Sequence, residues 1–230
     1  MQIDAILFDK DGTLFDFTAS WSGWVRRLIT ELGQTQGASE SALAGALRYD
    51  LATGHFDRAS PVIAGTVQDC ADLILPYLAT MPRSQLLDYL LATASEAEMI
   101  PATPLAPLLD TLRAQGLTLG VATNDGEAPA RAHLAHAGIT DRFAQILGYD
   151  SGFTPKPAPD MLLGFAAHIG VAPARVVMVG DSLHDLIAGR AAGMQTIGVL
   201  TGPATGETLA PHADIILPHI GHLPDLLQAD

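Results

Sequence analysis

Short apolar runs alternate with helical stripes along much of the chain, and this alternation predicts a parallel α/β fold. The first run, Ile3 to Phe8, is apolar enough for a strand that is buried on both faces. Comparable runs follow at residues 117–122, 145–148, 175–179, 196–200 and 214–217. Helical segments lie between most of these runs, and repeated β–α units of this length imply a parallel sheet with helices on both faces.

A long segment without strands interrupts the alternation. Its first helix is marked by one continuous apolar stripe, formed by Trp21, Trp24, Val25, Leu28, Ile29 and Leu32. Core packing of the two tryptophans is favoured over contact with a ligand. Further helices are predicted up to Leu51, from Ser60 towards Leu75, and from Ser84 to about Glu98. Residues 17 to about 95 are therefore predicted to form a helical insert.

Composition limits what the chain can bind. The 230 residues include 25 acidic side chains against 12 Lys and Arg, a formal net charge of -13. Nucleic acid and anionic membranes need a basic surface, so neither is expected as a partner. The single cysteine, Cys70, cannot form an internal disulfide. The start of the chain has no basic region followed by an apolar segment, and no apolar run is long enough to span a bilayer, so a cytoplasmic protein is expected.

Polar side chains follow four of the predicted strands. The four sets are Asp9 with Asp11, Thr123 with Asn124, Lys156, and Asp181 with Asp185. The carboxyl ends of parallel strands share one edge of the sheet, where ligands bind in open α/β sheets, so these groups are expected to converge. Each set taken alone has an ordinary explanation, such as a turn, a calcium loop, a solvated helix start or an N-cap, the last most seriously for Asp125 and Ser182. The four together favour a site.

At these positions the sequence resembles the haloacid dehalogenase superfamily of phosphohydrolases, and within it the phosphoglycolate-phosphatase type with an α-helical cap. The matching segments are FDKDGTLFD at 8–16, ATN at 122–124, KPAPD at 156–160 and VGDSLHDLIAGRAAG at 179–193. The resemblance implies a Rossmann-like core, residues 1–16 and 96–230, and an inserted cap domain, residues 17–95. It implies little about the substrate.

The residue types suit hydrolysis of a phosphate monoester. Asp9 is predicted to attack phosphorus and form an aspartyl-phosphate, and Asp11 to protonate the leaving alkoxide and later deprotonate water. Lys156 adds a fixed positive charge. Thr123, Asn124 and the backbone N–H of Gly12 are expected to hydrogen-bond the phosphoryl oxygens.

An all-oxygen ligand set indicates Mg²⁺ rather than zinc. The resemblance implies that the ligands are the Asp9 carboxylate, the backbone carbonyl of Asp11, and Asp181, with Asp185 close by. Mg²⁺ and Lys156 would together create a local anion site on an acidic protein. The expected partner is a small-molecule phosphate ester, and the chain is expected to be a monomer or a homodimer.

Two further residues carry predictions about their surroundings. Lys10 stands where relatives often have an apolar side chain, and strand alternation predicts that it points away from Asp9 and Asp11. In the insert, the loop from Gly54 to Arg58 is a candidate for substrate contact through His55 and Arg58, and a solvated turn is an equal alternative.

Rival activities share part of the same machinery. By resemblance, a haloacid dehalogenase lacks the second acid, so Asp11 argues against it. A phosphonatase needs a cap lysine, and residues 17–95 contain none. A phosphomutase of the β-phosphoglucomutase kind stays open, and a non-enzymatic phosphoacceptor module is disfavoured by Asp11, Lys156 and the insert. The physiological substrate among phosphoglycolate, sugar phosphates and nucleotides stays open as well.

Overall fold

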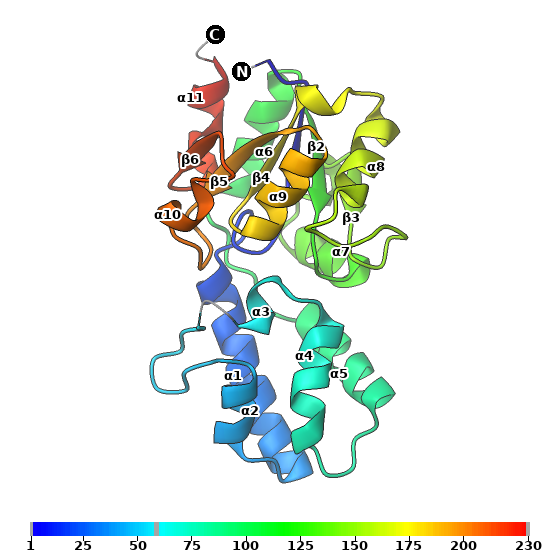
Figure 1. Cartoon of the computed structure of the whole chain (residues 1–230), viewed down its shortest axis with the longest axis vertical. Helices are drawn as coiled ribbons and strands as arrows, with labels where there is room; N and C mark the ends of the chain where they lie inside the picture. The colour runs from blue at the N-terminus through cyan, green and yellow to red at the C-terminus, as the bar shows by residue number, and fades with distance from the viewer. Residues whose placement is uncertain (1, 58–59, 229–230) are drawn as a thin grey trace.

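The computed structural model describes residues 2–57 and 60–228, and its centre is a parallel sheet (Figure 1). The strands are β1 (Ala5–Phe8), β2 (Thr118–Ala122), β3 (Gln145–Leu147), β4 (Val176–Gly180), β5 (Gln195–Val199) and β6 (Ile215–Leu217). They lie in the order β3-β2-β1-β4-β5-β6, and every pair is parallel. The predicted Rossmann-like α/β fold is confirmed.

The strand β1 lies at the middle of the sheet because it is apolar on both faces. Its four side chains are fully buried. Ala5 is paired with Thr118 of β2 on one side and with Val176 of β4 on the other. This shared register brings the carboxyl ends of the three strands to the same level, so that the residues following each strand meet at one edge.

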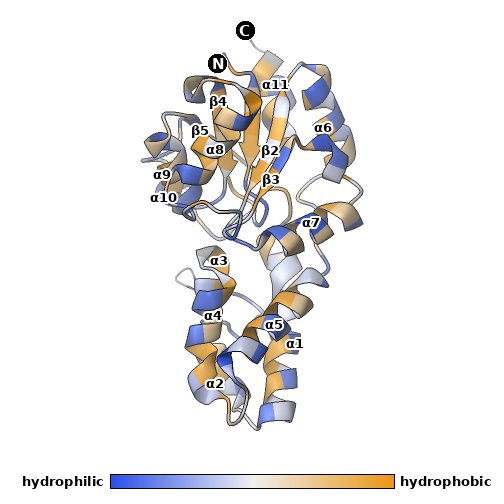
Figure 2. Ribbon diagram, turned by 90° about the vertical axis from the view of Figure 1, so that its right-hand side faces the viewer, coloured by the Kyte–Doolittle hydropathy of each residue, from blue (hydrophilic) through white to orange (hydrophobic). Residues whose placement is uncertain are grey.

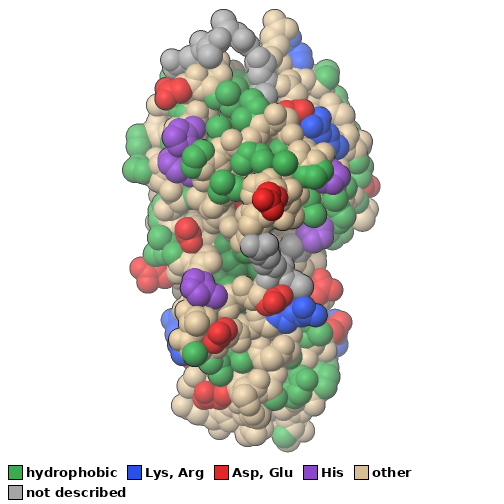
Figure 3. Space-filling view, turned by 60° about the vertical axis from the view of Figure 1, so that its left-hand side comes forward, with side chains coloured by type: hydrophobic (Ala, Val, Ile, Leu, Met, Phe, Trp, Pro, Cys, Tyr) green, Lys and Arg blue, Asp and Glu red, His purple; other side chains and the backbone are tan. Residues whose placement is uncertain are grey.

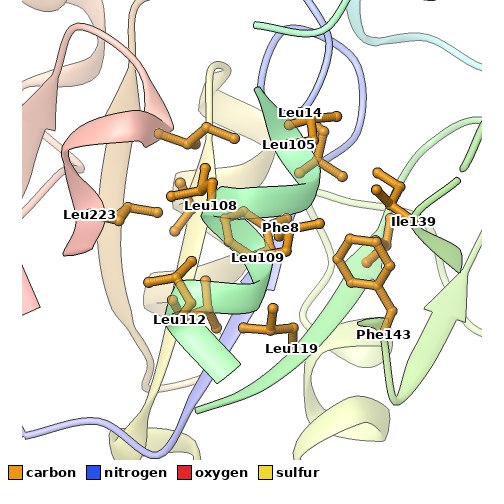
Figure 4. Close-up of a cluster of buried hydrophobic side chains, with 14 of the residues drawn as sticks. Phe8, Leu14, Leu105, Leu108, Leu109, Leu112, Leu119, Ile139, Phe143 and Leu223 are labelled. Carbon is orange, nitrogen blue, oxygen red and sulfur yellow. The ribbon is translucent and has the colours of Figure 1, made fainter. Parts of the chain in front are cut away.

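Helices cover both faces of the sheet. One face packs against α6 (Leu105–Ala114), α7 (Glu127–His136) and α11 (Leu223–Gln228), and Figure 4 shows the buried cluster between Phe8 and the leucines of α6. The other face packs against α8 (Asp160–Ile169) and α9 (Leu183–Ala191). A short helix, α10 (Gly206–Leu209), lies between β5 and β6. The described residues also form 3₁₀ turns at Leu75–Tyr77, Thr140–Arg142, Pro173–Arg175 and Ile220–His222.

In the described part of residues 17–95, five helices form a second layer beyond the carboxyl edge of the sheet, and we call them the cap helices (Figure 1). They are α1 (Phe17–Gln36), α2 (Glu40–Ala46), α3 (Pro61–Ala64), α4 (Val67–Ile74) and α5 (Arg83–Ser95). Apolar side chains on their facing sides build a buried cluster of their own, distinct from the two clusters of the sheet. Figure 2 shows hydrophobic residues along these helices, interspersed with hydrophilic ones.

Two cap helices differ from the predicted ones. The second helix ends at Ala46 rather than near Leu51, because Arg48 has a positive φ of 51° and Tyr49 then pairs with Phe56. The helix expected from Ser60 to Leu75 is divided into α3 and α4. The division occurs because Thr66 starts α4 with a capping box, in which Thr66 and Asp69 satisfy each other's backbone N–H groups.

The chain crosses between the sheet and the cap helices at two neighbouring points. Asp16 N donates to Ile100 O over 2.8 Å, and Ile100 N donates to Ser20 Oγ over 2.9 Å. Two adjacent crossings are the usual form of a hinge between a core and an inserted segment. The exact domain boundaries, 1–16 with 96–230 and 17–95, stay predictions.

The surface agrees with the acidic composition. On the face drawn in Figure 3, basic side chains are few and lie among acidic ones, without a continuous basic patch in its described part. Within residues 2–57 and 60–228, every helix is too short or too polar to cross a membrane.

Candidate active site

A cavity of about 90 Å³ lies between the carboxyl edge of the sheet and the cap helices. One water needs roughly 10–15 Å³ of such space, so the cavity has room for a small molecule. Its lining on the sheet side is Asp9, Asp11, Thr123, Asn124, Asp125, Lys156, Asp181, Ser182, His184 and Asp185. Every predicted strand-end set is represented in this lining, which fits the expectation that they converge.

Lys156 joins two of the predicted carboxylates. Its Nζ lies 2.7 Å from Asp9 Oδ1 and 2.5 Å from Asp185 Oδ1, and it donates a third bond to Ala122 O over 2.7 Å. Burial by itself would lower the pKa of Lys156, but Asp185 and Asp9 outweigh burial and raise it. The ammonium therefore stays charged, with all three of its protons directed at fixed oxygens.

Asp9, Asp181 and Asp185 form a buried carboxylate cluster. One oxygen of each lies within 4.8 Å of the others. Burial raises the pKa of Asp9 to about 7 against the opposing effect of Lys156, and burial together with Asp185 and Asp9 raises the pKa of Asp181. When all three carboxylates are ionised, the single positive charge of Lys156 does not balance their negative charge. A set of oxygen donors at this spacing fits a hard divalent cation.

Asp185 belongs both to a helix cap and to the site. Its Oδ2 accepts hydrogen bonds from the backbone N and the hydroxyl of Ser182 at the start of α9, while its Oδ1 accepts from Lys156. The N-cap explanation for Ser182 is thus correct, and it does not compete with the functional one, because the cap fixes the carboxylate that reaches Lys156.

The residues after β2 hold Lys156 in place. Asn124 Nδ2 donates to Lys156 O over 2.9 Å, and Asn124 Oδ1 accepts from Lys156 N over 3.0 Å. Thr123 is buried, and its Oγ1 accepts from Asp125 N over 3.1 Å. The Asn124 amide therefore contacts the backbone of the lysine, and contact of Thr123 or Asn124 with a phosphoryl group stays a prediction.

Gly12 contributes space rather than the expected hydrogen-bond donor. Its N–H donates to Phe15 O over 2.7 Å, inside the turn that follows β1, and the residue is not part of the cavity lining. Gly12 has a φ of +83°, and a Cβ there would lie 2.4 Å from Asp181 Oδ2. The absence of a side chain lets Asp181 approach the turn.

Lys10 contradicts its prediction, because it points towards Asp11. Its Nζ lies 2.8 Å from Asp11 Oδ1, and the side chain is fully buried. The alternation rule holds only within a strand, and β1 ends at Phe8, so Lys10 already belongs to the turn. Lys10 and Lys156 are the only lysines in the sequence, and each is paired with one of the two predicted catalytic acids.

Trp21 has a polar contact that the sequence did not predict. It is buried against Trp24 within the cap helices, as expected, and its Nε1 also donates to Asp11 Oδ1 over 2.8 Å. Trp24 Nε1 donates to Thr93 Oγ1, inside the cap. Both indoles line the cavity, so core packing and contact with the site are combined in the same stripe.

The cap side of the cavity is formed by residues that the sequence did not indicate. They are Trp21, Trp24, Val62, Ile63, Gly65, Thr66, Val67, Cys70 and Ala94. His55 is exposed and absent from the lining, and its contact with a substrate stays a prediction. Arg58 lies outside the described residues. The start of α4, whose Thr66-x-x-Asp69 capping box was readable in the sequence, occupies the position that was expected for the 54–58 loop.

Curated relatives match most of the chain. The probable phosphatase IndB of Dickeya dadantii is 33% identical over 89% of this chain and 84% of its own. The N-acetylmuramic acid 6-phosphate phosphatase of Pseudomonas aeruginosa is 27% identical over 99% of this chain and 96% of that protein. A phosphoglycolate phosphatase of Xylella fastidiosa is 31% identical over 96% of this chain and 92% of that protein.

A solved structure has the same fold over the whole length. The protein from Haemophilus somnus, described as a predicted phosphoglycolate phosphatase, gives a TM-score of 0.74 at 22% identity and covers 99% of both chains. Fold and site together define a phosphatase with a Rossmann-like core. The model of the haloacid dehalogenase-like hydrolases matches residues 3–193, and the chain belongs to that family. The predicted family and enzyme class are thereby confirmed.

Proposed function

We propose that this protein is a Mg²⁺-dependent phosphatase that hydrolyses a small phosphate monoester through an aspartyl-phosphate. The observation that carries the proposal is the site at the carboxyl edge, where Asp9, Asp181 and Asp185 cluster, Lys156 pairs with Asp9 and Asp185, and Asp11 lines the same cavity. The phosphatases named among the relatives support the reaction class.

In the first step, a carboxylate oxygen of Asp9 attacks phosphorus and the bond between phosphorus and the ester oxygen breaks. Asp11 donates a proton to that oxygen, so the leaving group departs as an alcohol. In the second step, Asp11 takes a proton from a water that attacks the phosphorus of the aspartyl-phosphate. Inorganic phosphate leaves, and the Asp9 carboxylate is restored.

The carboxylates of Asp9, Asp181 and Asp185, with the backbone carbonyl of Asp11, would hold the metal ion. When bound, Mg²⁺ neutralises phosphoryl oxygens that would otherwise repel the attacking carboxylate. Lys156 bridges Asp9 and Asp185 by donating a hydrogen bond to one oxygen of each, which fixes the two carboxylates beside the cavity. The cap helices cover the cavity and reduce its access to water, which favours phosphoryl transfer to Asp9.

The test is phosphate release, with and without Mg²⁺, from a panel of esters. The panel contains 2-phosphoglycolate, 2-hydroxyethyl phosphate, glycerol phosphates, hexose and pentose phosphates, N-acetylmuramic acid 6-phosphate, nucleotides and p-nitrophenyl phosphate. We expect Mg²⁺-dependent release from at least one alkyl ester, and none above background from the Asp9→Asn variant. Release by Asp9→Asn at the wild-type rate would contradict the mechanism. Isomerisation of a hexose 1-phosphate without release would identify a phosphomutase instead.

A further inference from the structure

A second buried lysine network lies beside the carboxylate cluster. Lys10 Nζ is 2.8 Å from Asp11 Oδ1, 3.1 Å from Asp125 Oδ2 and 3.1 Å from His133 Nδ1. The ammonium also lies 5.3 Å from the centre of the Trp21 ring. No part of the Lys10 side chain is exposed, although an isolated buried charge is costly. This cost is offset because Asp11, Asp125 and His133 can each accept a hydrogen bond from the ammonium and the Trp21 ring stabilises its charge.

The protonation states in this network follow from donor and acceptor rules. Lys10 can only donate, so Nδ1 of His133 accepts and the ring proton is on Nε2, which donates to Ala94 O over 2.8 Å. The network therefore pairs one ammonium with the carboxyls of Asp11 and Asp125, while a neutral imidazole acts as a spacer. The residues of this network come from the turn after β1, from α7 with the residue Asp125 shortly before it, and from the cap helix α5.

Asp11 receives two hydrogen bonds, and both reach the same oxygen. Lys10 Nζ and Trp21 Nε1 each donate to Oδ1 over 2.8 Å. A carboxyl that accepts two hydrogen bonds through one oxygen carries its proton on the other. Oδ2 is therefore the atom suited to give a proton to the leaving group and to take one from water.

We propose that Lys10 is a positioning residue for this acid–base step, and that together with Trp21 it holds Asp11 Oδ1 so that Oδ2 serves the ester oxygen. The inference rests on the proposed function. One donor comes from the turn after β1 and the other from α1, so the acid is fully oriented only while α1 lies against the core. Lys10 acts through Asp11 and has no contact with the reacting atoms.

The test separates positioning of an acid from general structural damage by changing the leaving group. An alkyl ester needs a proton on its departing oxygen, whereas p-nitrophenolate departs without one. The value of kcat/KM reports the steps up to cleavage of that bond. We compare Lys10→Met with wild type on p-nitrophenyl phosphate and on the alkyl ester of the panel that has the highest kcat/KM. Lys10→Met is expected to lose about tenfold or more on the alkyl ester and less than about threefold on p-nitrophenyl phosphate.

Two further variants keep the result decisive. Asp11→Asn should also lose more kcat/KM on the alkyl ester than on p-nitrophenyl phosphate, a difference that we call the split, and its loss should be larger than that of Lys10→Met. Trp21→Phe keeps a ring in the cap and removes only the second donor to Oδ1, so it should show a smaller split, and it replaces Lys10→Met as the test if that variant does not fold. Thr196→Val removes a buried hydroxyl in β5 that bonds His212 O and Asp214 and no member of the network, so it should affect both esters equally.

Equal losses on both esters, or no loss, in a folded Lys10→Met or Trp21→Phe variant would overturn the positioning role and leave the proposed function intact. A wild-type protein that releases no phosphate from any ester would reject the proposed function, and this role with it.

Discussion

At the scale of single residues, Gly12 shows how a missing side chain can build a site. The turn after β1 needs a positive φ, and the carboxylate of Asp181 occupies the space that a Cβ would fill. Gly37 ends α1 with a similar φ of +67°, but there a Cβ would meet nothing within 4 Å. The two glycines therefore carry the same backbone requirement and differ only in what they face.

This pair gives a matched test. Gly12→Ala and Gly37→Ala should both lose about 1 kcal/mol of unfolding free energy from the left-handed backbone. Only Gly12→Ala displaces Asp181, and we expect its Mg²⁺-dependent phosphate release to fall by about 100-fold or more, with Gly37→Ala within about twofold of wild type. Urea unfolding and the phosphate assay measure the two effects. Similar activities in the two variants would mean that the position of Asp181 is unimportant.

The sequence predicted the convergence of those residues whose position depends on strand ends. Asp9, Asp11, Lys156, Asp181 and Asp185 follow strands that are recognisable as short apolar runs, and parallel pairing brings them to one edge. The direction of Lys10 could not be predicted in the same way. It depends on the turn geometry, and on Asp125 and His133, which are more than a hundred residues away in the sequence.

At the scale of elements, α7 links the core to the cap through His133. Its ring lies between Lys10 and Ala94 O of α5, and burial together with the Lys10 charge lowers its pKa to about 4. In the unfolded chain a histidine titrates near 6.5. Between these two values the unfolded state takes up a proton that the folded state does not, so this residue makes stability fall as the pH falls from about 6.5 to about 4.

Replacement of His133 by Gln should remove this dependence. The amide can accept from Lys10 and donate to Ala94 O without titrating. Relative to wild type, His133→Gln should gain roughly 1–3 kcal/mol of unfolding free energy on going from pH 7 to pH 4.5, measured by urea unfolding at each pH. A constant difference between the two proteins across this range would show that His133 titrates normally in the folded state.

The cap helices were predicted as a group more reliably than one by one. The apolar stripe of α1 and the absence of strands from 17 to 95 are plain in the sequence, whereas the break between α3 and α4 depends on local capping by Thr66. That break matters for the site, because Val62 and Ile63 before it and Val67 after it all line the cavity. A single longer helix would have placed these side chains differently.

At the scale of the whole molecule, the cavity of this acidic protein has an uneven distribution of charge. The sheet side brings the carboxylates and Lys156. Among the described residues, the cap side brings indole, aliphatic, hydroxyl and thiol groups without formal charge. The leaving group is expected to face this uncharged side, because the phosphoryl group is held at the sheet edge.

This arrangement predicts a preference for a neutral leaving group. We expect kcat/KM for 2-hydroxyethyl phosphate to exceed that for 2-phosphoglycolate by about tenfold, since the carboxylate of glycolate would lie near acidic residues, and the described cap residues of the lining supply no cation. Val67→Arg places a cation on the cap side and should reduce or reverse the ratio. Preference of the wild type for 2-phosphoglycolate would contradict this assignment of the cavity.

The central position of β1 has a consequence for how the protein is made. β1 is the first strand of this sheet to be synthesised, but Phe8 and its partner in β2 are separated by more than a hundred residues. At typical synthesis rates its strand edges wait roughly 5–20 s for β2, and longer for β4. The cap helices emerge during that interval, and their contacts with one another are local. They can therefore assemble before the apolar strand on which the core depends has either of its partners.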